Sequence, residues 1–381
     1  MSVSADIELT GSFALEQRWF LENSPYDAIS NGQASLYIEP EWYWESETGL
    51  DSVTFKPYLR LDDTDSERTH SDIRELMWLH VGDDWELRTG IGKVFWGQTE
   101  SQHLVDVINQ TDFVEAIDGE DKLGQPMVNI QWIKDWGTAS IFLLPYFRER
   151  TFVGVEGRFR LPLEVAVDDA QYESNREQGH LDWAARWSHT LGDWEVGLSY
   201  FDGTSREPLL LPQVNNQEPV LMPYYEQMQQ IGVDTLAVVD SWLIKFEGIH
   251  RRSNSSDFTA ITTGFEYTQV GVMGSVIDLG YLMEYQYDER GEDATSLGQN
   301  DLMLGARFVF NDIDGTELLA GFVQDLDNSN SQSAFVEAFS RINDHWKWRV
   351  DGWFFTSEDT RDTLYLIRRD DYLQLSLEYY F

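Results

Sequence analysis

Apolar and polar positions alternate over the last ten residues of the chain. One face carries Leu373, Leu375, Leu377, Tyr379 and Phe381, and the intervening positions carry Gln, Ser, Glu and two Tyr residues. A repeat of two is the side-chain period of a β-strand. This segment is therefore predicted to be a strand with one apolar face, ending on an aromatic residue.

The same alternation recurs along the chain and predicts eighteen strands. The predicted spans are Asp6–Leu21, Gly32–Glu45, Ser52–Asp62, Asp72–Val81, Asp84–Trp96, Pro126–Lys134, Gly137–Arg148, Gly179–Thr190, Asp193–Asp202, Met222–Val239, Ser241–Arg251, Asp257–Val270, Gly274–Asp288, Asn300–Phe310, Thr316–Leu326, Gln332–Ile342, His345–Phe355 and Asp371–Phe381. Two of these segments could instead lie within loops, which leaves sixteen strands as the alternative.

Short and long connections alternate between the predicted strands. Gly82-Asp83 and Leu191-Gly192 are short turns, whereas residues 97–125 and 149–178 form long loops. This alternation is typical of an all-β, antiparallel up-and-down barrel that crosses a membrane, with short periplasmic turns and long extracellular loops. The whole chain, residues 1–381, is thus expected to form a single outer-membrane barrel.

Composition supports this class. Aromatic residues make up 14% of the chain and include 15 Trp, yet no run of 18 apolar residues could form a transmembrane helix. The chain has no cysteine, which excludes disulfides and thiolate metal sites. The formal net charge of −40 disfavours nucleic-acid binding, because phosphate contacts need a basic surface.

Charged residues of both signs occupy the face opposite the apolar one, where they would line the lumen. Arg60, Arg74, Arg88 and Arg148 are the basic candidates that we expect to line the pore. They could form a conduit that selects solutes, or a lattice of cross-strand ion pairs that stiffens the wall. Both interpretations remain open from the sequence.

Residues 97–125 provide the strongest candidate site. Four apolar residues, Leu104, Val105, Val107 and Ile108, are mixed with polar ones at a spacing compatible with a short amphipathic helix. We expect this loop to fold into the barrel and narrow it; the alternative is a mobile outer loop. The polar residues expected at the constriction are Gln98, Glu100, His103, Asp106, Asn109 and Asp112. Residues 149–178 are a second candidate plug, with Arg148, Arg150, Arg158 and Arg160 near the start of the loop.

Part of this region resembles a known family. The motifs are Arg74-Glu75-Leu76, Trp85-Glu86-Leu87-Arg88, Gly92-Lys93-Val94-Phe95-Trp96-Gly97 and Asp106-Val107-Ile108-Asn109-Gln110-Thr111-Asp112. Together they resemble a large, uncharacterised family of proteobacterial outer-membrane, porin-like proteins and, more distantly, the alginate-export porins. Gln110 stands where that family usually has proline.

The resemblance also implies partners and a place in the cell. A chain of this kind sits in the outer membrane among lipid and lipopolysaccharide, and the barrel-assembly machinery inserts it. Tyr379 and Phe381 of the closing strand would then serve as the insertion signal. Family members are thought to work beside periplasmic lipoproteins and inner-membrane exporters.

Two function classes follow from the sequence. The first is a channel for a solute, polymer or lipid-like substrate, and the second is a scaffold barrel that houses or docks a partner such as a lipoprotein. An enzyme is not expected, because the seven histidines fall in no recognisable nucleophile or metal motif. No cofactor or metal is expected either.

Overall fold

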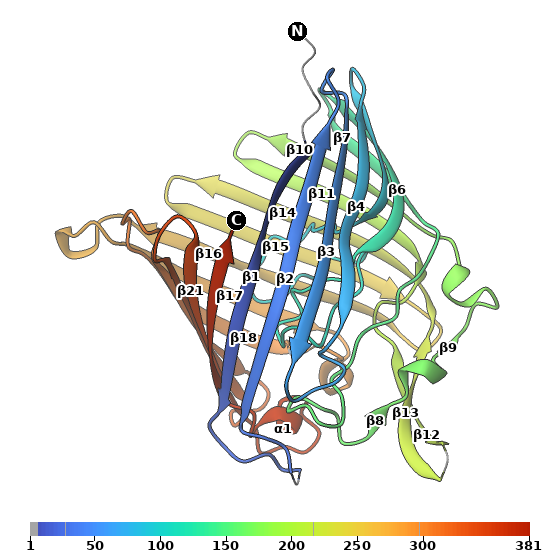
Figure 1. The fold of residues 1–381 in the computed structure, drawn as a ribbon, viewed down its shortest axis with the longest axis vertical. Coiled ribbons are helices and arrows are strands. Elements are labelled where there is room, and N and C mark those ends of the chain that lie inside the picture. Colours follow the sequence, from blue (N-terminus) through green and yellow to red (C-terminus); the bar gives the residue numbers. More distant parts are fainter. Residues whose placement is uncertain (1–6, 27, 216, 297) are drawn as a thin grey trace.

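A computed structural model describes residues 7–26, 28–215, 217–296 and 298–381. Eighteen strands form one closed antiparallel sheet, which confirms the predicted barrel class and the count of eighteen (Figure 1). The barrel strands are β1 (Ile7–Phe20), β2 (Gly32–Glu45), β3 (Asp51–Asp62), β4 (Ser71–Val81), β5 (Trp85–Gly92), β6 (Gln125–Lys134), β7 (Gly137–Leu144), β10 (Asp182–Leu191), β11 (Trp194–Thr204), β14 (Gln227–Val239), β15 (Trp242–Arg252), β16 (Asp257–Gln269), β17 (Asp278–Asp288), β18 (Asn300–Val309), β19 (Glu317–Asp325), β20 (Gln332–Arg341), β21 (Trp346–Thr356) and β22 (Tyr372–Tyr380).

The sheet closes where the first and last strands meet. β1 pairs with β2 along one side and with β22 along the other, in a register that places Ser12 opposite Tyr380. Beyond the ladder, the Phe381 amide donates to the Gly11 carbonyl oxygen at 3.1 Å. Closure satisfies the backbone of both terminal strands and leaves no free edge in the barrel, as a spanning β structure requires.

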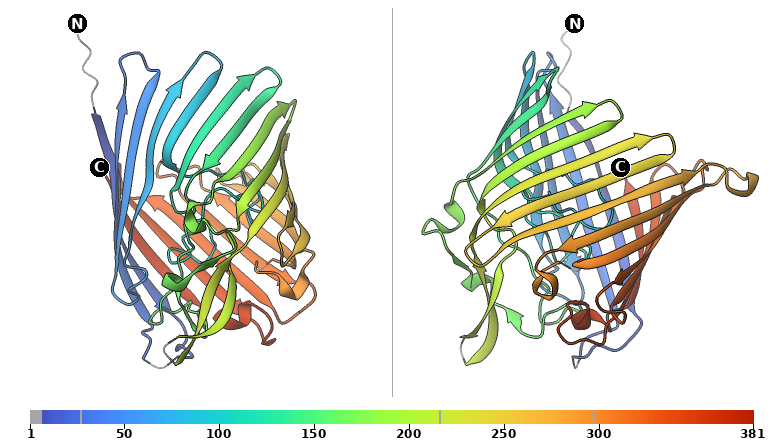
Figure 2. Two further views of the ribbon diagram at one scale, coloured as in Figure 1. Left: turned by 90° about the vertical axis from the view of Figure 1, so that its right-hand side faces the viewer. Right: turned by 180° about the vertical axis from the view of Figure 1, so that it is seen from behind.

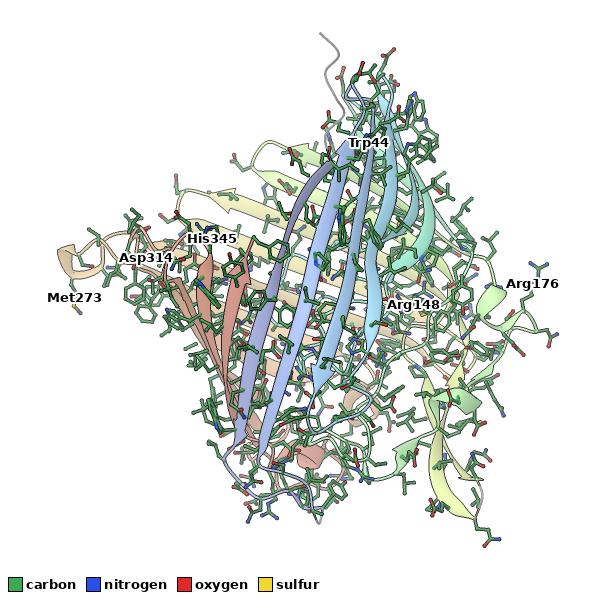
Figure 3. All side chains as sticks on the ribbon, viewed as in Figure 1. Trp44, Arg148, Arg176, Met273, Asp314 and His345 are labelled. Carbon is green, nitrogen blue, oxygen red and sulfur yellow. The ribbon has the colours of Figure 1, made fainter. Side chains whose placement is uncertain are left out.

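The two ends of the barrel differ. Short turns join the strands at the end where β1 begins and β22 ends, which we call the turn end; the opposite, loop end carries the longer connections (Figure 2). In Figure 3, Trp44 and His345 lie near the turn end, whereas Arg176 lies far out on a loop.

The outer face of the barrel is apolar. Large side chains along the strands, among them Leu15, Leu198, Leu304 and Leu375, have about half of their surface exposed outside the barrel. Apolar residues facing outward on alternate positions are what a lipid environment selects. On β17 the two faces are distinct, because Tyr281 and Met283 are exposed while Leu282 and Glu284 are buried.

Helices are minor. The described residues contain one α-helical turn, α1 (Leu364–Ile367), and four 3-10 turns at Val167–Asp169, Glu177–Gly179, Val272–Gly274 and Gly291–Asp293. None of the described helices has the length and apolar character needed to cross a membrane.

Two of the predicted strands differ most from the structure. β5 ends at Gly92 and not at Trp96, because the chain leaves the wall there and turns into the lumen. The predicted strand Met222–Val239 is two strands, β13 (Glu218–Tyr225) and β14, which separate at Glu226. That carboxylate accepts the hydroxyls of Ser253 and Ser255 at 2.8 and 2.5 Å, and so ties the break to the next loop. The predicted start at Asp6 lies outside the described residues.

A second, small sheet stands at the loop end. β13 pairs antiparallel with β12 (Leu209–Asn215) and parallel with two short strands, β8 (Glu164–Val165) and β9 (Gln171–Tyr172). The loops between β7 and β10 and between β11 and β14 therefore hold each other. In Figure 1 the β12–β13 hairpin projects beyond the end of the barrel.

Candidate functional site

The chain between β5 and β6, residues 93–124, forms the candidate site. We call it the inner segment. Its apolar residues Leu104, Val105, Val107 and Ile108 are all at least 92% buried, packed in one cluster with lumen-facing residues of the wall such as Phe201 and Ile249. Burial of four aliphatic side chains favours this position by roughly 1.5–3 kcal/mol each.

The inner segment contains no helix among its described residues, so the predicted amphipathic helix is wrong. The reason lies in where its backbone amides find acceptors. Glu247 of β15 accepts hydrogen bonds from the amides of Gln98, Thr99 and Val105 at 2.6, 2.9 and 3.2 Å. Side-chain acceptors of this kind compete directly with the carbonyls that a helix would use.

A second carboxylate holds the neighbouring residues. Glu284 of β17 accepts the amides of Glu100 and Ser101, each at 2.8 Å. Within the segment, Asp106 accepts the amides of Trp96 and Gly97 at 2.6 and 2.9 Å. Hydrogen bonds to ionised groups are stronger than neutral ones, so these carboxylates fix the path of the chain.

Buried ion pairs tie the far side of the inner segment to β3 and β4. Arg60 binds Glu115 at 2.6 Å and also contacts Glu16 of β1, while Arg74 binds Asp112 at 2.7 Å. All five side chains are nearly inaccessible to solvent. The inner segment is thus fastened to opposite walls, by apolar packing and carboxylates on one side and by arginines on the other.

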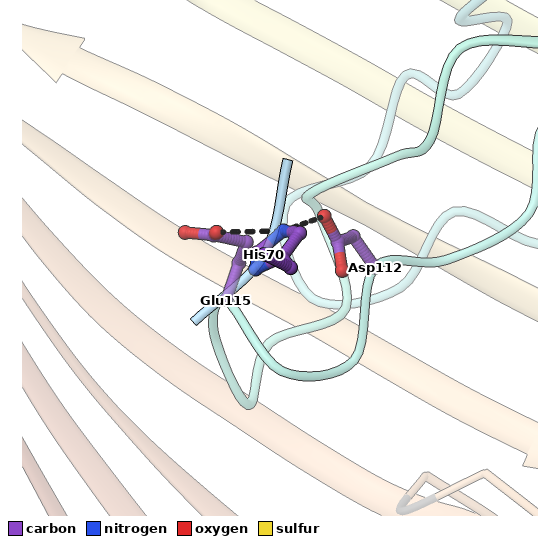
Figure 4. A group of neighbouring side chains, drawn as sticks. All are labelled: His70, Asp112 and Glu115. Atoms are coloured by element: carbon purple, nitrogen blue, oxygen red, sulfur yellow. Dashed lines mark hydrogen bonds and ion pairs between the residues drawn. The ribbon is translucent and has the colours of Figure 1, made fainter. Parts of the chain in front are cut away.

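His70, Asp112 and Glu115 meet in the same network (Figure 4). His70 Nε2 lies 3.2 Å from Asp112 and 3.3 Å from Glu115. Burial favours the neutral ring, but the hydrogen bond to Asp112 and the negative charges of Asp112 and Glu115 together outweigh it and raise the pKa of His70. The three groups are close enough to ligate a metal, but Arg74 and Arg60 already bind the same carboxylates. The cluster is therefore best described as an ion-pair network.

The inner segment separates two cavities. The loop-side chamber, of about 460 Å³, lies between the segment, the wall from β15 to β21 and the loop-end connections. The turn-side chamber, of about 860 Å³, lies against β1 to β4 and β21 to β22 and opens toward the turn end. Four residues line both chambers and so mark their boundary: His103, Asp118, Glu120 and Arg349.

His103 and Glu120 form the charged pair at this boundary, with Nε2 and Oε1 3.5 Å apart. Burial disfavours a charged imidazole, but Glu120 and the nearby Glu247 outweigh it and raise the pKa of His103 to about 10. The ring is therefore an imidazolium at neutral pH. Arg349 supplies a second cation, held by Asp351 at 2.8 Å.

The second long loop, residues 149–178, closes over the loop-side chamber. Arg158 donates to Asp370 at 2.8 Å and to Asn31 at 2.9 Å, linking this loop to two other connections. Phe159 packs edge-on against Phe20 and Tyr372 at the rim. The loop is thus fastened across the mouth of the barrel.

The predicted pore residues occupy several different positions. The loop-side chamber is lined by Glu100, His103, Asp106 and Asn109, and the turn-side chamber by Arg60 and Arg74.

Asn109 also joins the two ends of the inner segment, because its side-chain amide donates to the Gly92 and Leu123 carbonyl oxygens at 2.9 and 2.8 Å. Whether these residues control passage stays a prediction.

Other predicted residues lie away from the boundary. Asp112 belongs to the ion-pair network, and Gln98 is held by its amide on Glu247. Arg148 binds Asp72 at 2.6 Å, and Arg88 binds Glu86 at 2.8 Å on β5. Arg88 and Arg148 do not line either chamber.

Sequence reasoning did not single out Asp118 and Glu120 as site residues. They lie in the acidic stretch Glu115–Asp121, which looks like a solvated outer loop. The apolar residues 104–108 of the same loop are the signal that could have identified them. If residues 104–108 are buried in the lumen, the acidic residues that follow them in the chain must enter the lumen as well.

No protein-family model matches the chain, and no curated protein matches it. The resemblance of residues 74–112 to an uncharacterised outer-membrane family therefore stays a prediction. Solved structures that resemble the chain include two mutants of the Rhodopseudomonas blastica porin. Each shares 10% sequence identity over 99% of this chain and 100% of the porin, with TM-scores of 0.47 and 0.48. Likeness at this level says nothing about what passes through the barrel.

Proposed function

We propose that this protein is a porin-like channel of a bacterial outer membrane, which carries a solute through its lumen past the inner segment. The supporting observation is the arrangement of two chambers in series, one toward each end of the barrel, that share His103, Asp118, Glu120 and Arg349 as a common boundary. The apolar outer face and complete closure fit a barrel embedded in lipid.

The boundary carries charges of both signs. His103 and Arg349 face Asp118 and Glu120, so neither cations nor anions meet a barrier of uniform sign. A mixed boundary of this kind favours selection by size and by local charge pattern over strong selectivity for one ion.

Conductance of the purified protein in planar bilayers tests the proposal. We expect discrete single-channel steps, and deletion of residues 101–115 should raise the step size several-fold because it removes the middle of the inner segment. Correct insertion of the deletion variant is checked by its resistance to unfolding in detergent at room temperature. An inserted deletion variant with unchanged conductance would refute the constriction and favour a scaffold that houses or docks a partner such as a lipoprotein.

A further inference from the structure

One wall of the loop-side chamber is apolar although it faces the lumen. Lumen-facing positions on β18 to β21 carry Met303, Leu319, Val323, Phe335 and Trp353, and all five line the chamber. In a barrel with a water-filled lumen these alternate positions are polar. Met303, Leu319 and Phe335 pack into one cluster and are at most 9% exposed, whereas Val323 and Trp353 are only partly buried against it. An apolar wall at this place in the path suits a ligand with an apolar body.

Aromatic rings dominate this wall. Phe335 and Trp353 stack with centroids 5.1 Å apart and planes inclined by 24°, and Trp353 continues to Phe355 at 6.2 Å and 17°. The three rings are close to parallel and run from β20 onto β21 toward the loop end. Parallel faces of this kind suit a flat or extended apolar group lying along them.

A glycine makes room for the wall. Gly321 is directly opposite Phe335 in the β19–β20 register. A Cβ atom at Gly321 would lie 2.3 Å from the Phe335 ring, so any larger residue would push that ring into the chamber. The absence of a side chain at Gly321 keeps Phe335 back against the sheet and the chamber open.

The carboxylates of the chamber are already engaged. Each one that lines it has a cation or a hydrogen-bond donor beside it: Glu100 with Arg307, Asp106 with the Trp96 amide, Asp118 with the Glu120 amide, Glu120 with His103, Glu207 with Arg251, Asp288 with Arg290, Asp301 with the Gln299 amide, and Glu337 with Arg349.

Arg150 differs from these groups. It lines the same chamber, and no carboxylate of the described residues forms an ion pair with its guanidinium. Its contacts are a 3.4 Å hydrogen bond from Nε to Gln110 and the ring of Phe113 at 5.9 Å. Arg160 and Lys122 also line the chamber, and their printed hydrogen bonds go to carbonyl and hydroxyl oxygens and not to carboxylates. Guanidinium stays charged in proteins, so the uncommitted charge in this chamber is positive.

We infer that the loop-side chamber binds an amphipathic anion, with its apolar, ring-containing body against Phe335 and Trp353 and its carboxylate on Arg150. The chamber's 460 Å³ lies within the range of small-molecule sites. This inference rests on the proposed channel function, because it names the class of solute that would pause in the path. Arginine and a carboxylate form a bidentate pair, which fixes the orientation of the ligand.

Binding of 2-naphthoate to the full-length protein in lipid nanodiscs tests this inference by calorimetry, with empty nanodiscs as the reference for partitioning. We expect 2-naphthoate to bind at least about tenfold more tightly than acetate, which lacks the apolar body, and than 2-(aminomethyl)naphthalene, which has the opposite charge. Equal affinity for all three compounds would overturn the inference.

Three variants locate the ligand. Arg150→Met and Phe335→Ser should each weaken 2-naphthoate binding by about tenfold, the effect of losing roughly 1.4 kcal/mol of interaction. Arg176→Met, an exposed arginine on the same long loop (Figure 3), should leave binding unchanged. Naphthoate affinity that survives Arg150→Met in a correctly inserted protein would refute the assignment of the carboxylate.

Conductance of the same purified protein in planar bilayers separates this inference from the channel proposal. Single-channel steps without selective naphthoate binding would contradict the amphipathic-anion site and leave the channel standing. Tight, Arg150-dependent binding without any conductance would contradict the channel and leave the chamber as a ligand site.

Discussion

Asp121 gives the turn-side chamber a group that titrates near neutrality. Burial, together with the carboxylates of Glu115 and Asp118, raises the pKa of Asp121 to about 7. The side chain is therefore mostly neutral at pH 6 and mostly charged at pH 8. A charge that appears between these values lies directly on the proposed path.

We predict that raising the pH from 6 to 8 increases the preference of the channel for K⁺ over Cl⁻. The reversal potential in a KCl gradient measures this change. The variant Asp121→Asn should show a clearly smaller shift, since it cannot gain the charge. The same shift in the variant and the parent would show that Asp121 does not face the permeating ions.

A substitution at Leu304 tests whether the outward-facing side of the strands contacts lipid. It lies near the middle of β18 with 48% of its surface exposed, next to the exposed side chains Met283 and Phe322 on the flanking strands. Leu304→Arg should destabilise the inserted barrel by about 2–4 kcal/mol, the cost of a charge near the bilayer midplane. Urea unfolding in lipid vesicles provides the measurement.

Ser333→Arg is the matched control for that substitution. Ser333 lies on β20 and lines the loop-side chamber, where added charge meets water and not lipid. It should cost much less stability than Leu304→Arg. Equal losses would mean that the faces of these strands are assigned the wrong way round.

At the scale of residues, the sequence predicts which face of a strand a side chain occupies, but it does not predict that side chain's hydrogen-bond partners. A period of two is enough to assign Tyr281 and Met283 outward and Glu284 inward, because neighbouring residues in a strand must point to opposite sides. The role of Glu284 could not be predicted, since the Glu100 and Ser101 amides that donate to it lie far away in the sequence and are brought to it only by the fold.

Among the elements, the inner segment depends most on Glu247. That side chain is fully buried and accepts three backbone amides and the Thr99 hydroxyl. Glu247→Gln replaces one acceptor oxygen by an amide NH2 group, which cannot accept the hydrogen bonds of the surrounding amides. Each buried group left without a partner destabilises the segment by roughly 1–3 kcal/mol.

We therefore expect Glu247→Gln to raise amide hydrogen exchange across residues 98–105 while the barrel strands stay protected. Asp325→Asn is the matched control: Asp325 of β19 is also a buried carboxylate that accepts backbone amides, but those amides belong to Asp327 and Asn328, at 2.7 and 2.9 Å, and not to the inner segment. It should leave exchange in residues 98–105 unchanged. Unchanged exchange in Glu247→Gln would show that the apolar cluster alone holds the segment.

The predicted secondary structure is wrong where a side chain, and not a backbone carbonyl, accepts the hydrogen bond of a backbone amide. All eighteen wall strands follow from alternation, because their hydrogen bonds run to neighbouring strands in regular order. The helix expected near residues 104–108 does not form, because the Val105 amide donates to the Glu247 carboxylate of the wall. The break at Glu226 was missed for a similar reason, since it depends on Ser253 and Ser255 in another loop.

For the whole molecule, the seam between β1 and β22 decides whether the barrel closes. Tyr379 packs against Phe13 at 5.2 Å and Trp346 at 5.0 Å, and Phe381 bonds Gly11 through its backbone in both directions. The role of Tyr379 and Phe381 as an insertion signal stays a prediction.

We predict that Phe381→Ala lowers the amount of heat-modifiable, assembled protein in outer membranes without lowering synthesis, whereas Phe381→Tyr, which keeps an aromatic ring, assembles normally. Electrophoresis of membrane fractions with and without heating measures both. Normal assembly of Phe381→Ala would show that closure and recognition do not need an aromatic residue at this position.

The double fastening of the inner segment has a mechanical consequence. A plug fixed at one point can swing aside under load, but this one is tied to β15 and β17 on one wall and to β3 and β4 on the other. Moving it would break charged contacts on both walls at once. The aperture should therefore keep a constant size under an applied voltage, so that molecules are sorted by whether they fit and not by when the path opens.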